Sequence, residues 1–514
     1  LGLGQANYNR AIHLVASYCG STAVMLSAHQ SIGVPQPVKL FGTEEQKQRY
    51  LTLCARGAIS AFALTEPDVG SDPARLATTA TATDDGEHVL ITGSKLWITN
   101  GLIADLMVVM ARDAATSKID AYVVEMDRPG ITLGHHCRFM GLKALANGVI
   151  RFDGVQVPVA NRIGAPGQGL KVALVTLNTG RLSLPAACVG ASRRCVEWAR
   201  DFAAERVQWG APVGQHEAIA HKLADLAATT YAMESWSRLA ADLSMREGYD
   251  IRLEAAAAKE WASTRNWQII DDAVQIRGGR GYENERSLAA RGEKPFPLER
   301  MMRDSRINRI FEGSSEIMHL FMAREMVDQH LQVAGKMLER DATLSERLGA
   351  LPAMAAFYAR WYPGLWWGLP TFFRYGEYGR LGEHLRYAER ASRRLAREVF
   401  HGMVRYQAGL EKKQAWLFRT VDIAMEIAVL CATVVRAHGR LVAHDPVAAR
   451  AIELADLHGH NARRVIEDRF RALWDNDDVR RYGVGRDVLA GHHAWMESPW
   501  ADITEVAGAP DEAS

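Results

Sequence analysis

Hydrophobic and polar positions change their pattern twice along the first two thirds of the chain. Up to about residue 57, apolar residues recur at helical spacing, in 8–26 and again after the acidic helix start at 43–47. A second region has short alternating runs bounded by turn residues, which predict strands at 58–64, 78–83, 88–92, 106–111, 121–125 and 149–157. Long helical patterns then return at 170–177, 181–206, 219–247, 253–276 and 315–332. The pattern predicts a mainly α protein with a central β domain.

The remainder of the chain reads as a further helical unit. Its most apolar helix, 421–437, carries Asp422 and Glu426 and is shorter than the roughly 20 apolar residues of a membrane span. We therefore interpret it as a buried helix of a bundle. The predicted domains are 1–57, 58–166, 167–332 and 333–514.

The segment 357–378 is unusually rich in aromatic residues: Trp361, Tyr362, Trp366, Trp367, Phe372, Phe373, Tyr375 and Tyr378. One interpretation is a loop anchored by aromatics to its own bundle. The other is a membrane-interface segment, because Trp and Tyr favour the headgroup boundary and an arginine stripe suited to anionic lipid follows. The stripe consists of Arg386, Arg390, Arg393, Arg394 and Arg397. Glu383, Glu389 and Glu398 can neutralise it locally, so both interpretations stay open.

Charge and cysteine content narrow the function classes. Sixty-one basic residues balance sixty acidic ones, which leaves no global field for attracting a nucleic acid. The six cysteines are scattered without a C-x-x-C pair, which favours a reducing compartment and suggests neither a zinc site nor a disulfide framework. The chain starts with Leu1 and lacks a signal-like block, so we expect the true N-terminus to lie upstream.

Two motifs imitate known sites and are rejected. The glycine-rich run 275–282 follows a helix rather than a strand, so its glycines are interpreted as a helix cap and not as a dinucleotide fingerprint. His216 and His221 are five residues apart and cannot share a helix face as a zinc-binding H-E-x-x-H motif requires. We propose no metal site.

Glu312 is the candidate base. It follows Ile310 and Phe311 and precedes Gly313, two serines and a helical pattern. Burial against the two apolar residues would raise its pKa toward the range of a general base, which the following helix N-terminus would partly oppose. The alternative is an acid that merely occupies a helix start. Two further elements could hold a ligand: the strand and turn at 61–72, and Trp97 with Thr99, predicted to share one strand face.

Seven motifs occur in one order, and together they resemble the acyl-CoA dehydrogenase family over residues 1 to about 330. They are Leu64–Asp72, Lys95–Gly101, Asn178–Arg181, Glu205–Gly210, Gln275–Gly279, Met302–Asp304 and Ile310–Ile317. The tail is similar to the very-long-chain branch, which carries an extra C-terminal helical domain associated with dimerisation and inner-membrane contact.

The resemblance implies N-terminal helices, a β-barrel-like middle domain and a four-helix bundle, with FAD between domains and subunits. Glu312 would be the catalytic base. Phe62, Leu64, Thr65, Ser71, Trp97, Ile98 and Thr99 would line the flavin, with Ser71 also at the substrate and Thr99 near flavin N5. Arg206, Trp209, Gln275, Gly278 and Gly279 would hold the diphosphate and adenosine end, the last three from a neighbouring subunit. Ser314 and Glu316 would also contact the cofactor, and Asn178, Arg181, Phe311 and Gly313 would contact the acyl-CoA.

The implied activity is dehydrogenation of an acyl-CoA to trans-2-enoyl-CoA, with electrons passed to an electron-transfer flavoprotein. We expect a homodimer in the bacterial cytoplasm or the mitochondrial matrix, with a possible peripheral membrane contact through 357–397. Small residues at Ser21, Ala23, Ser27 and Ala28 favour a deep groove and long acyl chains. An insertion at 283–298 could reshape the rim of the CoA or FAD site. Near Gly180, where some family members carry the base, there is no acid.

Two rival functions remain. An acyl-CoA oxidase would share the site but return its electrons to O2. A flavin-bearing assembly scaffold would use the C-terminal unit to dock a partner, although retention of Glu312 argues against a purely structural role.

Overall fold

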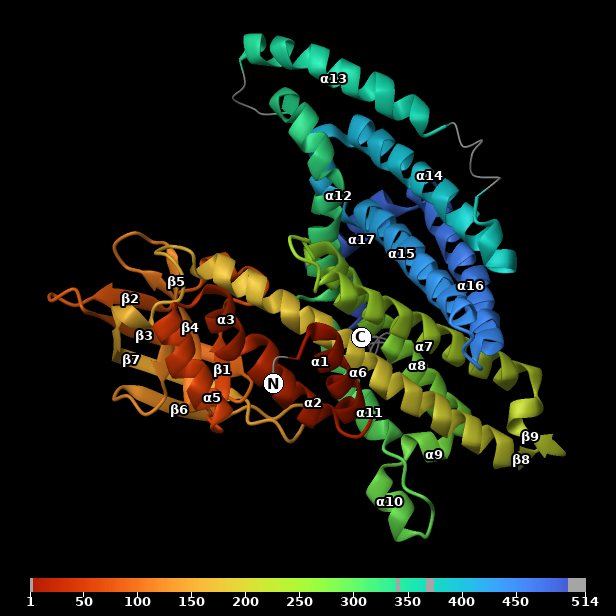
Figure 1. The fold of residues 1–514 in the computed structure, drawn as a ribbon, viewed down its shortest axis with the longest axis horizontal. Coiled ribbons are helices and arrows are strands. Elements are labelled where there is room, and N and C mark those ends of the chain that lie inside the picture. The colour runs from red at the N-terminus through yellow and green to blue at the C-terminus, as the bar shows by residue number, and fades with distance from the viewer. Residues whose placement is uncertain (1–2, 339–342, 367–373, 498–514) are drawn as a thin grey trace, which may run out of the picture.

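The computed structural model describes residues 3–338, 343–366 and 374–497 (Figure 1). It is helical up to Ala55, forms a sheet between Ser60 and Pro158, and is helical again from Gly169 onward. The predicted fold class, mainly α with a central β domain, is confirmed.

The N-terminal helices are short: α1 (Gln5–Ala16), α2 (Gly20–Ser27), α3 (Pro35–Phe41), α4 (Glu44–Gln46) and α5 (Thr52–Ala55). Two π-helical turns, Ala28–Ile32 and Lys47–Leu51, lie among them. The run 8–26, predicted as one helix, is therefore divided after Ala16. Periodicity does not locate this break, because α1 and α2 both pack against the same long helix, α6.

The sheet contains seven strands: β1 (Ser60–Ala63), β2 (Thr79–Ala82), β3 (His88–Ile98), β4 (Leu106–Asp113), β5 (Ile119–Glu125), β6 (Ile131–His136) and β7 (Gly148–Pro158). Its order is β1-β4-β2-β3-β7-β6, with β5 paired to β4. β4 runs parallel to β1 and β2, and all other pairs are antiparallel. The pattern missed β6, an edge strand whose residues are nearly all exposed and therefore show no buried face.

The bundle that follows is built on α6 (Gly169–Glu205), which crosses the molecule from the β domain to the small hairpin β8 (Val207–Gln208) and β9 (Ala211–Pro212) (Figure 1). The other helices are α7 (Glu217–Leu243), α8 (Arg252–Arg277), α9 (Gly279–Tyr282), α10 (Glu285–Ala290), α11 (Leu298–Ser305) and α12 (Ser315–Leu338). α8 ends at Gly278, with φ 58°, so the glycine run does cap a helix as predicted.

α6 is a single helix, whereas the sequence predicted two helices separated at residues 178–180. Asn178 and Gly180 are helical and buried, so Gly180 marks a close contact rather than a helix end. Among the described segments, α6 is also the one helix long and apolar enough to cross a bilayer, but 72% of its most apolar stretch is buried inside the protein.

The helices after the bundle form a further unit that we call the C-terminal domain of this chain. They are α13 (Leu344–Gly364), α14 (Gly382–Tyr406), α15 (Gln414–Val442), α16 (Ala448–Trp474) and α17 (Asp478–Leu489). One continuous apolar core joins α15 and α16 to the bundle, which confirms the buried-helix interpretation of 421–437. α13 lies at the edge of the molecule (Figure 1), and Phe357 to Tyr362 pack aromatic rings against Phe400 and His330. Part of the predicted aromatic segment is thus a helix; Trp367, Phe372 and Phe373 lie outside the described residues.

Candidate active site

Glu312 lies in a short loop between the 3-10 turn Arg306–Arg309 and α12. Its φ of 59° and that of Gly313, 92°, are both left-handed. For a glutamate this conformation costs about 1–3 kcal/mol, and it persists only where the surroundings fix the backbone.

Three basic side chains fix that backbone by donating to its carbonyl groups. Arg181 Nε of α6 donates to Glu312 O at 3.3 Å, and Lys259 Nζ of α8 donates to Gly313 O at 2.6 Å. His319 Nδ1 of α12 lies 2.7 Å from Ser315 O. Glu312 and Gly313 are therefore each held by one donor, and the first residue of α12 is held by a third.

The carboxylate itself has no such partner. Glu312 Oε2 is buried without a hydrogen bond to any described residue. It lies over Gly180, where an added Cβ would be 2.5 Å from Oε2 and 2.9 Å from Ile32 Cδ1. Only glycine leaves this space free, which explains a glycine inside a buried helix.

Burial raises the pKa of Glu312 to about 7, and the charges of Arg181 and Lys259 partly oppose the rise. The direction agrees with the sequence argument, but the cause differs in part. Ile310 is 52% exposed, whereas the carboxylate lies over Gly180 of the buried helix α6. A carboxylate with a pKa near neutrality is suited to general-base catalysis.

Hydroxyl groups gather beside Gly180. Ser183 Oγ donates to Gly180 O at 2.9 Å and lies 2.8 Å from Ser27 Oγ, and Ser31 Oγ donates to Tyr8 OH at 2.8 Å. Burial raises the pKa of Tyr8, and the charge of Glu312 adds a smaller increase. Tyr8, Ser31 and Ser183 were not predicted, because isolated hydroxyl residues on helices give no distinct sequence signal.

A second set of predicted residues lies at the end of β3. Trp97 is 55% exposed with φ 58°, Ile98 is buried, and Thr99 Oγ1 accepts from Asn147 Nδ2 at 3.1 Å. The register with β7 shifts between Lys95 and Ile98, and β3 ends at Ile98. Simple strand alternation therefore does not place Trp97 and Thr99 on one face, contrary to the sequence argument.

The strand-and-turn motif is fastened to this edge. Leu96 N donates to Thr65 O at 3.0 Å. Buried Lys95 donates to Glu66 Oε1 at 2.7 Å, and Glu66 accepts from Ala77 N at 2.6 Å and Thr78 N at 3.0 Å. The ion pair thus positions Phe62, Leu64 and Thr65 beside the end of β3, while Ser71 lies in the exposed turn beyond.

A third predicted set lies far from Glu312 along the chain. Arg206 follows the C-terminus of α6, and Trp209, 95% exposed, forms the turn of the β8–β9 hairpin. Gln275, Gly278 and Gly279 are exposed at the end of α8. From Gly180 to the end of α6 the axial distance is roughly 38 Å. One chain therefore does not bring Arg206 and Trp209 to Glu312.

Asn178 and Arg181 are both buried, at 7% and 9% exposed, and Arg181 Nη1 donates to Asn178 Oδ1 at 3.1 Å. Their observed contacts are to each other and to the Glu312 backbone, a role that the resemblance did not predict. Phe311 and Gly313 flank Glu312, Ser314 directly precedes α12, and Glu316 lies in the first turn of α12.

Lys259 is the main basic residue that the sequence reading missed. It is fully buried and burial lowers its pKa to about 8. Its signal was a lone lysine after four consecutive alanines, 255–258, in a helix. The rejected zinc motif is also accounted for: His216 Nε2 lies 3.0 Å from Gln208 O, and His221 is exposed.

Three family models match the chain: the N-terminal, middle and C-terminal domains of acyl-CoA dehydrogenase, over residues 1–58, 61–155 and 167–327. Probable acyl-CoA dehydrogenase FadE10 of Mycobacterium tuberculosis is 50% identical, covering 99% of this chain and 79% of that protein. The human mitochondrial very long-chain specific acyl-CoA dehydrogenase is 33% identical, covering 94% and 74%.

Solved structures agree. An acyl-CoA dehydrogenase complexed with FAD from Bacillus anthracis has a TM-score of 0.77 and 27% identity, covering 94% of this chain and 81% of that chain. Butyryl-CoA dehydrogenase of Megasphaera elsdenii has a TM-score of 0.59 and 34% identity, covering 63% and 83%.

Proposed function

Because this chain belongs to the acyl-CoA dehydrogenase family, we propose that it oxidises long-chain acyl-CoA to trans-2-enoyl-CoA and delivers the electrons to an electron-transfer flavoprotein. It is an FAD-dependent oxidoreductase of fatty acid oxidation, as the sequence predicted. The observation that carries the proposal is the buried, unpaired carboxylate of Glu312, whose pKa is about 7.

In the proposed reaction Glu312 takes the proton α to the thioester. Its carboxylate is free to do so because Arg181 and Lys259 donate to the Glu312 and Gly313 carbonyls rather than to the carboxylate. In the family, the backbone N–H of the base residue donates to the thioester carbonyl. The backbone N–H of Glu312 would do the same and would stabilise the charge that develops on that carbonyl. Bound FAD supplies the acceptor for the β-hydrogen as hydride.

The residues present fit FAD. Trp97 offers an exposed indole at the end of β3, and a Cβ added at Gly278 or Gly279 would meet nothing within 4 Å, so backbone there is open to close approach. Since Arg206 and Trp209 lie at the far end of α6, roughly 38 Å from Gly180, we propose that each site is completed by a second copy of the chain. A homodimer is the simplest assembly that does this.

We propose a preference for long acyl chains, supported by a cavity of about 50 Å³ beyond Gly180. Part of its wall contains small or aliphatic residues, and another part is polar and includes Asn266, Arg300, Asp304 and Asn308; the small or aliphatic residues are Ala16, Gly20, Ala23, Val24, Ala187 and Ala191. Ala187 and Ala191 lie about two and three turns along α6 from Gly180. We expect Ala187→Leu to lower kcat/KM for hexadecanoyl-CoA about tenfold while sparing butanoyl-CoA; an equal loss for both substrates would contradict this route for the acyl chain.

A peripheral membrane contact is also proposed, and α13 supports it better than the arginine stripe. α13 has no buried residue and exposes Leu344, Leu348 and Leu351. In the stripe, Arg394 pairs with Glu467 at 3.0 Å and Arg397 donates to Leu365 O at 2.7 Å. Co-sedimentation with anionic liposomes should weaken in Leu344→Ser/Leu348→Ser; undiminished binding would exclude α13. The bacterial and mitochondrial relatives suggest a cytoplasmic or mitochondrial-matrix location.

The decisive experiment is anaerobic bleaching of the flavin by palmitoyl-CoA in wild type, Glu312→Gln and Glu316→Gln. We expect Glu312→Gln to bleach about 10²–10⁴-fold more slowly, the usual contribution of a general base. Glu316→Gln changes an exposed acid one turn away that the resemblance assigns to the cofactor, so it separates a loss through FAD binding from the loss of the base. Bleaching of Glu312→Gln at the wild-type rate would refute the assignment, and rapid peroxide formation from O2 would favour the oxidase alternative.

A further inference from the structure

Two acids lie on the otherwise apolar face of α15, Asp422 and Glu426, one helical turn apart. Both reach out of the C-terminal domain into the bundle. The family models end at residue 327, so these acids come from a part of the chain beyond them. Their partners are the two helices that hold the catalytic loop, α12 and α8.

Asp422 connects to the loop through His319. Asp422 Oδ1 lies 2.9 Å from His319 Nε2, and His319 Nδ1 lies 2.7 Å from Ser315 O. Both ring nitrogens therefore face acceptors, an arrangement that is satisfied only when both carry protons. Arg469 Nε of α16 lies 2.9 Å from Asp422 Oδ2, and the His319 ring packs on Phe418 at 4.8 Å. The histidine is thus fixed from the C-terminal domain.

Glu426 connects to α8. Its Oε1 accepts from Trp261 Nε1 at 2.9 Å and from Arg265 Nη2 at 2.5 Å. Trp261 lies two residues after Lys259, the donor to Gly313 O. One face of α15 therefore contacts both α12 and α8. These two helices carry His319 and Lys259, two of the three donors to the backbone at 312–315.

We propose that the C-terminal domain positions the catalytic loop, and that Asp422 and His319 are positioning residues acting through the backbone of Ser315. The inference rests on the proposed role of Glu312. A base whose left-handed backbone is held only by its surroundings loses alignment when one anchor is removed, and small misplacements of reacting groups reduce rates strongly.

The test compares Asp422→Ala with Asp478→Ala in the FAD-loaded, full-length protein. Asp478 is the matched control because it pairs with Arg419 of the same helix, at 2.6 Å, and its side chain is 23% exposed against 26% for Asp422. It joins α15 to α17 and has no contact with the loop. A purely structural role for Asp422 would make the two variants alike.

We expect Asp422→Ala to reduce the flavin with hexadecanoyl-CoA about tenfold more slowly, with an unchanged Kd for the substrate. The peptide covering 310–318 should exchange its amide hydrogens faster in substrate-free enzyme. Asp422→Asn, which keeps an acceptor for His319, should recover much of the rate. Asp478→Ala should match wild type in both measurements.

Wild-type rate and exchange in Asp422→Ala, or equal losses in Asp478→Ala, would overturn the proposal. If Asp422→Ala does not fold, His319→Gln is measured instead. Its carboxamide has one donor nitrogen and cannot replace the two separate ring N–H groups, so it should show the same losses, and wild-type behaviour would again overturn the proposal. Failure of the proposed function has a different signature. In that case wild type is not bleached by acyl-CoA, whereas the exchange comparison needs no substrate.

Discussion

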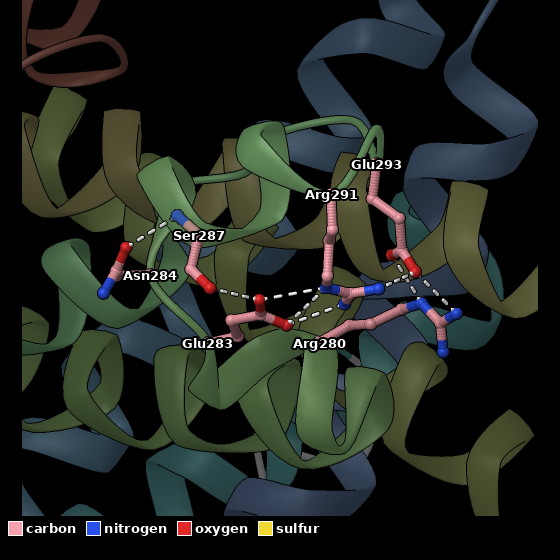
Figure 2. A network of polar contacts seen from close by, with 6 residues as sticks. All are labelled: Arg280, Glu283, Asn284, Ser287, Arg291 and Glu293. Carbon is pink, nitrogen blue, oxygen red and sulfur yellow. Dashed lines mark hydrogen bonds and ion pairs between the residues drawn. The ribbon is translucent and has the colours of Figure 1, made fainter.

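Glu283 and Glu312 lie on either side of α11, and both have an arginine nearby, yet their pKa values are shifted in opposite directions. Glu283 accepts from Arg291 Nη2 at 2.6 Å and from Ser287 Oγ at 2.6 Å (Figure 2). These hydrogen bonds lower its pKa to about 2. Burial raises the pKa of Glu312 to about 7.

The difference lies in where the donors point. Around Glu283 the donors bind carboxylates: Arg291 binds both Glu283 and Glu293, and Arg280 binds Glu293 (Figure 2). At Glu312 the basic groups of Arg181 and Lys259 donate to backbone carbonyls and leave the carboxylate oxygen Oε2 unpaired. A nearby cation by itself does not lower the pKa of a carboxylate below the range of a general base. A hydrogen bond donated directly to the carboxylate oxygens does.

Among the changes that test this comparison, a methyl group added at Gly180, beneath the Glu312 carboxylate, should slow flavin reduction most. In Gly180→Ala the new Cβ would lie 2.5 Å from Glu312 Oε2, so the carboxylate must move. We expect flavin reduction by hexadecanoyl-CoA to slow about 100-fold, as for a misplacement of roughly 1 Å.

Gly439→Ala is the control for that change, because it is also a helical glycine and a Cβ there meets nothing within 4 Å. It should keep the wild-type rate. Wild-type turnover in Gly180→Ala would mean that the observed place of the carboxylate is not the one used in the reaction.

Lys259→Met should have a smaller effect that depends on pH. With a pKa of about 7 for Glu312, the ionised fraction and the rate in wild type should rise about tenfold from pH 6 to pH 8. Removing the Lys259 charge raises this pKa further, so the rising limb should move to higher pH, by about one unit, and the rate at pH 7 should fall about fivefold.

The two pH profiles should approach each other above about pH 9, where the carboxylate is ionised in both proteins, and a loss that persists there measures the missing hydrogen bond to Gly313 O. A uniform loss at all pH values would instead indicate that Lys259 acts only through its hydrogen bond to Gly313 O.

The sequence predicted the mainly α fold and made Glu312 the candidate base, because apolar periodicity and short motifs are local signals. It did not predict what surrounds Glu312. The gap above Gly180, the direction of the Lys259 ammonium and the reach of Asp422 to His319 join residues far apart in the chain. Residues 178–180 were even interpreted as a helix break, because a glycine that makes room and a glycine that ends a helix look alike in sequence. The effect of the 283–298 insertion on the CoA or FAD rim stays a prediction.

The smallest effect is expected for Glu283→Gln. Glu283 is paired at the surface, and its lowered pKa means that its contribution to stability is present above the ordinary glutamate range and is lost as the pH falls through about 2. Exposed pairs contribute little at neutral pH, so Tm at pH 7 should fall by about 1 °C or less, and the rate of flavin reduction should stay within about twofold of wild type. Thermal unfolding and stopped-flow bleaching measure the two quantities. A tenfold loss of rate with an unchanged Tm would show that the network of Figure 2 acts on the active site, and the contrast between a reactive and a silenced glutamate would no longer hold.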